Sequence, residues 1–325
     1  MRDSDRSSFG IREHLNTFRR KSIDDTAGAR SFGKAPRAQF QRNVLGEFGR
    51  LNPIAEGDLV LLYFDVRRHW LLRVAKGKEF HTHKGFIRTD QLIGLPLGSE
   101  VKSSLSETFW ALKPSTDDLI MHSVRRTQIM YPKDIGLILL KLSLSAGMKV
   151  LEIGCGSGAM TVAAATAVKP TGCVHSYEVR SEFADIAEKN LKRASVSDYV
   201  ILHRADASLG ISGEEFDAAI IDVGDPWALF PLVHKALTGG SPLVSFSPTM
   251  NQVERTTDVL RGVGFVNVYS LECFIREIRA DTGKTRPATM MVGHTGYLTF
   301  GQKVIRPEPL ALNIREEEVI NGGVE

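Results

Sequence analysis

The chain has 325 residues, of which 42% are hydrophobic and 24% charged, with a formal net charge of +3. This composition is ordinary for a water-soluble globular protein, and the length suggests two domains, or one large domain with an appendage. No apolar run approaches the ~18 residues that span a membrane, and the polar first residues predict no secretory signal. The cysteines, Cys155, Cys173 and Cys273, form no CxxC pair. We therefore expect a cytoplasmic protein without a disulfide framework.

The charge is unevenly distributed along the chain. Residues 1–50 hold 11 Lys and Arg against 6 Asp and Glu, whereas residues 305–325 hold 2 against 5. We predict a flexible basic arm over residues 1–52 and an acidic tail over residues 305–325. The arm is either a solvated segment or a nucleic-acid-binding one, and its composition does not separate these two readings.

Short β-rich runs follow the arm and predict a small β domain over residues 53–114. The runs are separated by Gly, Asp and Lys, a pattern typical of a small antiparallel sheet or barrel. They cover residues 59–64, 70–74, 79–83, 85–87 and 109–112.

From residue 115 to residue 304, predicted strands and helices alternate. Alternation of this kind predicts an α/β fold, a mostly parallel sheet covered by helices on both faces. Two late strands without a helix between them indicate an antiparallel edge. The expected helices cover residues 134–144, 159–168, 182–193, 229–237 and 252–262, and the expected strands cover residues 149–153, 173–179, 200–204, 217–223, 243–246, 266–273 and 295–300.

A glycine loop directly after the first of these strands is the most informative segment. It reads E-x-G-x-G-x-G from Glu152 to Gly158, which is neither the dinucleotide GxGxxG spacing nor the P-loop. Glycines let the backbone approach a ligand closely, and the following helix offers free N–H groups. The alternative is a loop that only makes a strand–helix turn. The pattern is similar to that of Class I S-adenosylmethionine-dependent methyltransferases.

Three acidic residues follow the next three strands: Glu178, Asp206 and Asp222. Each lies at the carboxyl end of its strand, the edge at which open α/β sheets bind ligands. There, Glu178 can accept the ribose hydroxyls of a nucleoside and Asp206 can accept the adenine amino group. Three acids in consecutive strands after such a loop predict a nucleoside-binding site.

Several separated segments together resemble the tRNA (adenine-58-N1)-methyltransferase family. They read TQIMYPKD at 127–134, DVGDPW at 222–227, VGHTGYL at 292–298, and HTHKGFIRTDQLIGLPLGSEV at 81–101. The resemblance covers about residues 53–303. Cys155 stands where the family often has Thr in the glycine loop. Methyltransferases generally tolerate Cys there, so this difference does not weaken the resemblance.

The resemblance implies a Class I methyltransferase (Rossmann-like) fold that binds S-adenosyl-L-methionine and methylates N1 of adenine 58 in tRNA. Asp222 would lie beside the target base, and Tyr131 near the pocket mouth, as catalytic residues. The cofactor-binding residues would be Gln128, Gly154, Gly156, Ser157, Gly158, Glu178, Asp206, Ala207 and Asp222. A homotetramer is also implied by resemblance.

In folded RNA, N1 of adenine faces the base with which it pairs, so the adenine must leave its stack before it can be methylated. The enzyme must therefore bind a deformed tRNA, mainly through its phosphates. The candidate RNA contacts are basic or aromatic side chains. For the basic residues the alternative is an ordinary solvated surface, and for Trp227 it is packing within the protein. The candidates are Arg125, Arg126, Trp227, Arg276, Arg279, Lys284 and Arg286.

Other readings stay open or are set aside. His81 and His83 could bind a metal, but this spacing on a strand more often gives two ordinary histidines, so no metal is expected. His294 is expected to be structural, and nucleophilic catalysis by Ser157 is not expected. A small-molecule methyltransferase of the corrin-precursor type and a non-catalytic RNA-binding subunit remain alternatives. The sequence does not decide whether adenine 57 is also modified.

Overall fold

The computed structural model describes residues 53–126, 128–213 and 215–305. The predictions for the basic arm, for Thr127 and for residues 306–325 lie outside the described residues. Among the helices within these ranges, none has the length and apolarity needed to cross a membrane.

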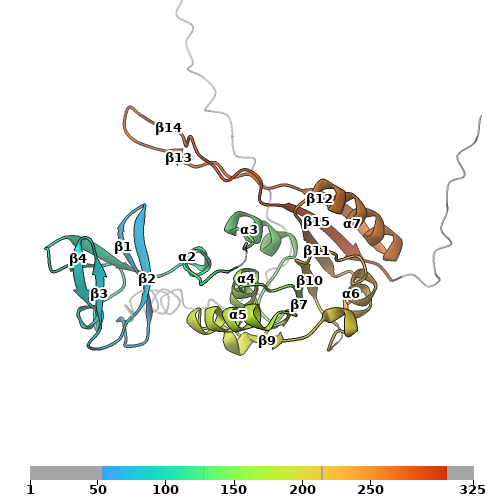
Figure 1. The fold of residues 1–325 in the computed structure, drawn as a ribbon, viewed down its shortest axis with the longest axis horizontal. Coiled ribbons are helices and arrows are strands. Elements are labelled where there is room, and N and C mark those ends of the chain that lie inside the picture. Colours follow the sequence, from blue (N-terminus) through green and yellow to red (C-terminus); the bar gives the residue numbers. More distant parts are fainter. Residues whose placement is uncertain (1–52, 127, 214, 306–325) are drawn as a thin grey trace, which may run out of the picture. The chain divides into compact units, whose positions relative to one another are not determined.

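A four-stranded antiparallel sheet and a separate hairpin follow Pro53 (Figure 1). The buried side chains of Val60, Leu62 and Phe109 lie in the core of this β region. The sheet has the order β2-β1-β6-β5 and consists of β1 (Leu59–Asp65), β2 (Arg68–Arg73), β5 (Ser99–Lys102) and β6 (Thr108–Leu112). The hairpin consists of β3 (Glu79–Thr82) and β4 (Gly85–Arg88), which the 3-10 turn η1 (Thr89–Leu92) follows.

A short helix, α2 (Thr116–Met121), connects this region to the rest of the chain. Ser115 and Asp118 begin it with a capping box, in which each side chain bonds to the other residue's backbone N–H. This pairing satisfies two N–H groups that the first helical turn would leave without partners. The sequence analysis did not predict this helix.

The predicted mostly parallel sheet is present, with seven strands in the order β12-β15-β11-β10-β7-β8-β9. The five strands from β11 to β9 pair in parallel, and β15 runs antiparallel between β11 and β12. The α/β fold with an antiparallel edge is therefore confirmed. The strands are β7 (Lys149–Ile153), β8 (Cys173–Tyr177), β9 (Val200–His203), β10 (Ala218–Ile221), β11 (Pro242–Ser247), β12 (Phe265–Leu271) and β15 (Tyr297–Lys303).

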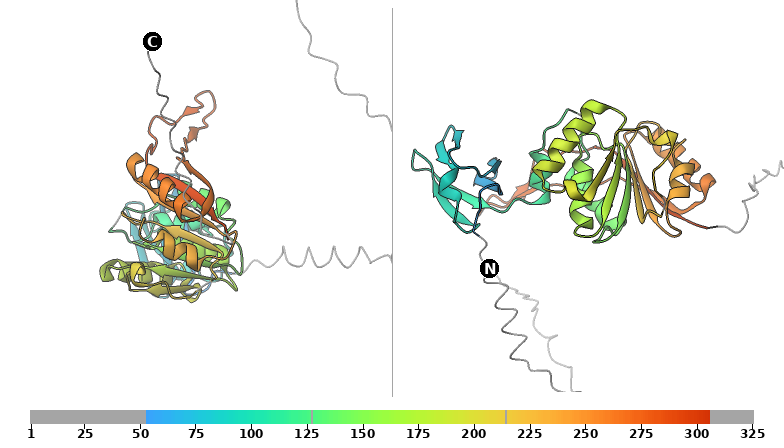
Figure 2. Two further views of the ribbon diagram at one scale, coloured as in Figure 1. Left: turned by 90° about the vertical axis from the view of Figure 1, so that its right-hand side faces the viewer. Right: turned by 90° about the horizontal axis from the view of Figure 1, so that it is seen from below.

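Helices cover both faces of this sheet (Figure 2). The two-residue period of β7 separates the faces: Val150 joins the core that contains α3 and α4, whereas Leu151 and Ile153 join the core that contains α6 and α7. The helices are α3 (Pro132–Lys141), α4 (Ala159–Val168), α5 (Ser181–Arg193), α6 (Phe230–Ala236) and α7 (Met250–Val263), with 3-10 turns η2 (Ser197–Tyr199) and η3 (Ala207–Leu209).

A small hairpin that the sequence analysis did not predict lies between β12 and β15. It consists of β13 (Ile278–Arg279) and β14 (Arg286–Pro287), and it extends away from the seven-stranded sheet (Figure 1). The segments that carry it expose apolar side chains: Phe274, Ile275, Ile278, Met290, Met291 and Val292. The hairpin therefore combines an apolar surface with the basic residues singled out above.

Candidate active site

The glycine loop joins β7 to α4 under tight steric constraint. Gly154 has φ +92°, and a Cβ there would lie 2.1 Å from the backbone oxygen of Asp222. A Cβ at Gly158, with φ +83°, would lie 3.2 Å from Ala187 of α5. Glycine therefore allows β7, β10 and α5 to approach one another at the loop. The loop's backbone N–H groups are left close to the carboxyl edge of the sheet.

Glu178 is the acid most closely tied to the loop. It is only 4% exposed, and its Oε2 accepts a hydrogen bond of 2.9 Å from the backbone N–H of Gly156. Its Oε1 accepts one of 3.1 Å from the backbone N–H of Arg180. The carboxylate thus lies beside the loop at the end of β8, where the sequence analysis expected a nucleoside-binding acid.

Asp206 and Asp222 follow β9 and β10. Asp206 caps the turn η3, and its Oδ1 accepts a hydrogen bond of 2.8 Å from the backbone N–H of Ser208. This bond holds the pKa of the Asp206 carboxyl below its usual value. Asp222 is held by a 2.9 Å backbone bond from its N–H to the carbonyl of Ile153, which places it against the glycine loop.

Burial and neighbouring charge change the acidity of this cluster. Burial, together with the carboxyls of Glu152 and Glu178, raises the pKa of Asp222 to about 7. Burial also raises the pKa of Glu152, although the hydroxyls of Ser176 and Thr161 donate to its Oε2 at 2.5 and 2.6 Å. Like charges in a poorly hydrated site disfavour full ionisation. Asp222 can therefore gain or lose a proton near neutral pH.

The loop and the acids line one cavity of about 580 Å³. A smaller recess of about 20 Å³ beside it shares Gln128 and Asp222 and is also lined by Ser157. Arg180, Ser208 and Leu229, which lie outside the motifs quoted above, line the larger cavity as well, and so does Asp225 of the DVGDPW segment. The structure brings together in that cavity the predicted residues Gln128, Gly154, Gly156, Glu178, Asp206, Ala207 and Asp222.

Tyr131 borders a different hollow from the one that Asp222 lines. It precedes α3 and lines a second hollow, of about 470 Å³, together with Met121, Met290 and Val292. It is not among the residues that line the cavity with Asp222. Gln128, which precedes Tyr131 by three residues, does line that cavity, so the chain passes from one hollow to the other within a few residues.

A buried ion pair at the start of α3 was missed by sequence reasoning. The ammonium of Lys133 lies 2.8 Å from Asp134, which is fully buried, and donates to the carbonyl of Cys273 at 2.7 Å and to the hydroxyl of Thr295 at 2.6 Å. Thr295 in turn donates to Asp134 at 2.7 Å. This network ties the start of α3 to both chain segments that carry the β13–β14 hairpin.

The basic residues proposed to contact RNA are exposed. Arg125 and Arg126 lie after α2, and Arg125 donates to the carbonyl of Met121 at 3.0 Å. Within the hairpin, Arg279 pairs in register with Arg286. The exposed residues of this region also include Arg276 and Lys284.

Trp227 packs on the core next to α6, and the guanidinium of Arg255 lies 3.7 Å from its ring centroid. One face of the ring is thus covered by a cation. Of the histidines, His81 is exposed and pairs with Glu79 at 3.3 Å. His294 bonds to Glu272 at 2.7 Å and to the carbonyl of Pro248 at 3.1 Å.

This sheet order, glycine loop and set of strand-end carboxylates define an S-adenosylmethionine-dependent methyltransferase fold. Solved structures agree. An S-adenosylmethionine-dependent O-methyltransferase of Thermotoga maritima is 35% identical, with a TM-score of 0.74, over 80% of this chain and 98% of that one. A tRNA (1-methyladenosine-58) methyltransferase of Aquifex aeolicus is 32% identical, with a TM-score of 0.68, over 78% of this chain and 100% of that one.

The family follows from sequence comparison. The family described as "tRNA methyltransferase complex GCD14 subunit" matches residues 110–286, and the one described as "TrmI-like N-terminal" matches residues 53–101. The tRNA (adenine(57)-N(1)/adenine(58)-N(1))-methyltransferase TrmI of Methanocaldococcus jannaschii is 33% identical over 68% of this chain and 86% of its own length. TrmI of Thermus thermophilus is 29% identical over 71% and 91%, respectively. The chain belongs to the tRNA (adenine-58-N1)-methyltransferase family, as the resemblance indicated.

Proposed function

We propose that this protein transfers a methyl group from S-adenosylmethionine to N1 of adenine 58 in tRNA. The observation that carries the proposal is the position of Asp222, whose carboxyl has a pKa of about 7 and lines the same cavity as the glycine loop and Glu178. Membership of the family supports the choice of tRNA as substrate and of adenine N1 as the acceptor atom.

The residues of the cavity fit S-adenosylmethionine. The volume of about 580 Å³ lies within the range of small-molecule sites. Gly154, Gly156, Ser157 and Gly158 form a loop whose backbone can approach the methionine part closely. Glu178 would accept the ribose hydroxyls, and Asp206, with Ala207, would bind the adenine edge. When bound, S-adenosylmethionine supplies an electrophilic methyl group on a sulfonium centre.

Asp222 would act on the acceptor base. Adenine N1 already carries a lone pair, so alignment rather than a strong base makes the nucleophile effective. Methylation leaves a positive charge on the ring. An ionised Asp222 that accepts a hydrogen bond from the exocyclic amine would stabilise this developing charge and could later accept its proton. A partly protonated carboxyl near pH 7 suits that exchange.

The exposed basic residues would hold a deformed tRNA through its phosphates. Arg125 and Arg126 lie near Gln128 in sequence, and Arg276, Arg279, Lys284 and Arg286 project from the hairpin region. Contacts to phosphate supply affinity without reading sequence, which suits an enzyme that must extract one base from folded RNA.

We also propose that the protein acts as a homotetramer in the cytoplasm, where its substrate would be found. The exposed apolar side chains around the hairpin, such as Ile278 and Met290, support self-association, since patches of this kind commonly mark interfaces. Light scattering on the purified protein tests this state directly, and a monomeric mass would contradict it.

Nucleoside analysis of bulk tRNA after incubation with S-adenosylmethionine tests the proposed reaction. We expect 1-methyladenosine. Because the relative from M. jannaschii is named for both positions 57 and 58, transcripts with only one of the two adenines would separate them. Binding of S-adenosylmethionine without RNA methylation would favour a small-molecule methyltransferase, and failure to bind it would favour a non-catalytic subunit.

A further inference from the structure

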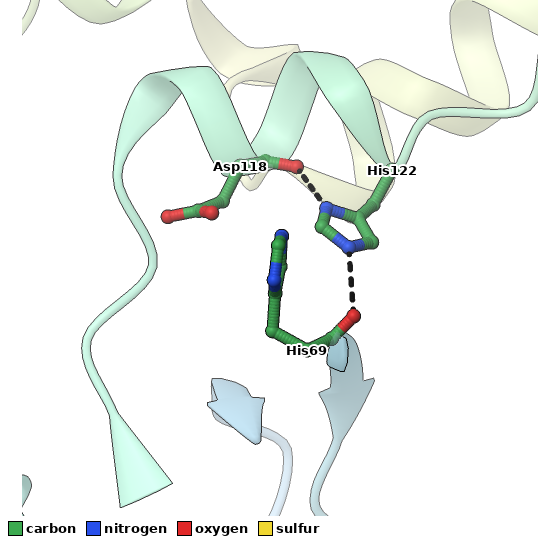
Figure 3. Close-up of side chains that lie close together, drawn as sticks. All are labelled: His69, Asp118 and His122. Atoms are coloured by element: carbon green, nitrogen blue, oxygen red, sulfur yellow. Dashed lines mark hydrogen bonds between the residues drawn. The ribbon is translucent and has the colours of Figure 1, made fainter. Parts of the chain in front are cut away.

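Three side chains that commonly bind metals meet where strand β2 faces helix α2: His69, Asp118 and His122 (Figure 3). One potential ligand atom of each lies within 4.8 Å of those of the other two. Asp118 and His122 are four residues apart, the spacing that brings two side chains to one face of a helix. None of the three lines the cavity that contains Asp222.

His69 has a ring nitrogen without a partner. Its Nδ1 is buried and makes no hydrogen bond within the described part of the chain. Leaving such a group unsatisfied is unfavourable, because burial removes its hydrogen bonds to water and nothing replaces them. The ring stands between the Asp118 side chain and the His122 ring (Figure 3), and its centroid lies 5.2 Å from that of His122. A ligand bound at this point would satisfy the ring.

Both ring nitrogens of His122 face backbone carbonyl oxygens. Its Nε2 lies 3.2 Å from the carbonyl oxygen of His69, and a proton there would donate to that oxygen. Its Nδ1 lone pair would then face the carbonyl oxygen of Asp118 at 2.9 Å. A neutral imidazole carries one ring proton, so the other ring nitrogen presents its lone pair to a carbonyl oxygen, and a cation bound beside the two would relieve that contact.

The surrounding contacts hold these groups in position. The Oδ2 of Asp118 accepts hydrogen bonds from the N–H and hydroxyl of Ser115 at 2.8 and 2.6 Å, which leaves Oδ1 for another ligand. The guanidinium of Arg193 donates to the carbonyl of His122 at 2.8 Å and to that of Leu71 at 3.0 Å. Both sides of the cluster are thus fixed by hydrogen bonds that do not use the candidate ligand atoms.

We propose that His69, Asp118 and His122 form a binding site for a divalent transition-metal ion, with zinc the best fit. Two imidazole nitrogens, one carboxylate oxygen and a fourth position open to water are a donor set that zinc commonly takes. Zinc ligands lie about 3.4 Å apart in a tetrahedron, so side-chain rotation must draw the widest pair, at most 4.8 Å apart, together by up to about 1.4 Å. The ion would link β2 to α2 and stabilise their packing.

Calorimetric titration of the chelator-treated, dialysed full-length protein with Zn²⁺ tests the site. We expect saturable binding of one ion per chain and a higher unfolding temperature with zinc. His69→Gln and His122→Gln should each weaken binding more than about tenfold while leaving the affinity for S-adenosylmethionine unchanged. The matched control is His81→Gln, which replaces an exposed histidine of β3 and should bind zinc as the wild type does.

A second readout does not depend on the folding of any variant. Co²⁺ added to the wild-type protein should give the visible absorption of a tetrahedral nitrogen and oxygen site, and Zn²⁺ should displace it. The proposal is overturned if the wild-type protein binds no stoichiometric zinc, or if both glutamine variants bind it as tightly as the wild type. Failure here leaves the methyltransferase proposal untouched, since the two sites share no residue.

Discussion

A hydrogen bond of 2.9 Å joins the carboxylate of Glu178 to the backbone N–H of Gly156, across 22 residues of sequence. It connects the end of β8 to the glycine loop that follows β7. The acid expected to hold the ribose is therefore also the group that orients the loop expected to hold the methionine part. A change at Glu178 should affect both halves of the cofactor site.

Replacing Glu178 with Ala should weaken S-adenosylmethionine binding by ten- to a hundredfold. Hydrogen bonds to charged groups contribute about 1.5–3 kcal/mol, and each 1.4 kcal/mol is about tenfold in affinity. Isothermal titration calorimetry measures the effect. Glu182→Ala, which removes an exposed glutamate from the first turn of α5, is the matched control. Equal affinities for the two variants would count against the assigned role of Glu178.

Gly154→Ala should destabilise the protein by at least about 2 kcal/mol and abolish cofactor binding. The added Cβ would lie 2.1 Å from the backbone oxygen of Asp222, and φ +92° is itself strained for alanine. Gly136→Ala, in the middle of α3 with no neighbour within 4 Å, should instead be tolerated or stabilising. Thermal unfolding compares them, and similar unfolding temperatures would show that the loop is not constrained as described.

The single-turnover rate of methyl transfer should rise with pH through the region near 7. The pKa of Asp222 is about 7, and the ionised carboxylate is the form that stabilises a cationic adenine. Asp222→Asn should lower the rate by at least about a hundredfold and remove this dependence, while S-adenosylmethionine still binds. Stopped-time assays with saturating enzyme between pH 5.5 and about 8.5 measure it. A variant that keeps the wild-type pH profile would exclude Asp222 as the titrating group.

The same carboxyl makes a prediction for stability. Its folded pKa lies above its unfolded value of 3.8, so the folded protein binds a proton that the unfolded chain releases. The stability from this group is therefore full below pH 3.8 and is lost as the pH rises towards 7. Asp222→Asn should be more stable than the wild type by about 1–3 kcal/mol at pH 8. The gain in the free energy of unfolding should be smaller at pH 5. Urea unfolding of both proteins at the two pH values measures it, and a variant less stable than the wild type at pH 8 would contradict the raised pKa of Asp222.

Lys133→Met should destabilise the protein by about 3–5 kcal/mol, because it leaves the buried Asp134 carboxylate without its cation. The double variant Lys133→Met with Asp134→Leu removes both charges and should recover part of that loss. Urea denaturation of the two single variants and the double variant gives the coupling energy. Strictly additive effects would mean that the pair does not act as a unit.

Replacing Arg279 and Arg286 with Gln should weaken tRNA binding and reduce its salt dependence, with a change in slope of roughly 0.7–0.9 for each phosphate that the variant no longer neutralises. S-adenosylmethionine affinity should not change. Arg204→Gln is the control, because this arginine already pairs with Asp185 at 2.7 Å and Glu188 at 3.0 Å. Filter binding at several salt concentrations measures how the tRNA affinity depends on salt. An unaltered slope of log affinity against log salt would mean that the RNA phosphates do not contact Arg279 and Arg286.

The regular elements could be predicted because their patterns are local. The α4 helix begins at Ala159 and ends at Val168, as expected. The carboxyl ends of parallel strands meet at one edge of the sheet, so the position of the strand-end acids could also be predicted. The α3 helix starts earlier than its apolar stripe suggested, at Pro132, because proline fits the first helical turn. It ends before Ser143, whose φ of +53° breaks the helix.

What escaped prediction depends either on contacts distant in sequence or on elements too short to show a pattern. Thr295 donates to Asp134 across 161 residues, and no local pattern marks that pair. The two-residue strands of the β13–β14 hairpin are too short to show alternation.

Position-resolved methylation of a tRNA transcript tests whether this protein methylates N1 of adenine 58. The purified protein, S-adenosylmethionine and a transcript are incubated under single-turnover conditions, and the methylated position is mapped by mass spectrometry. The account predicts 1-methyladenosine at position 58, absent when guanosine replaces that adenine and strongly reduced with Asp222→Ala. Methylation of another atom or position, or undiminished transfer by Asp222→Ala with intact cofactor binding, would contradict it.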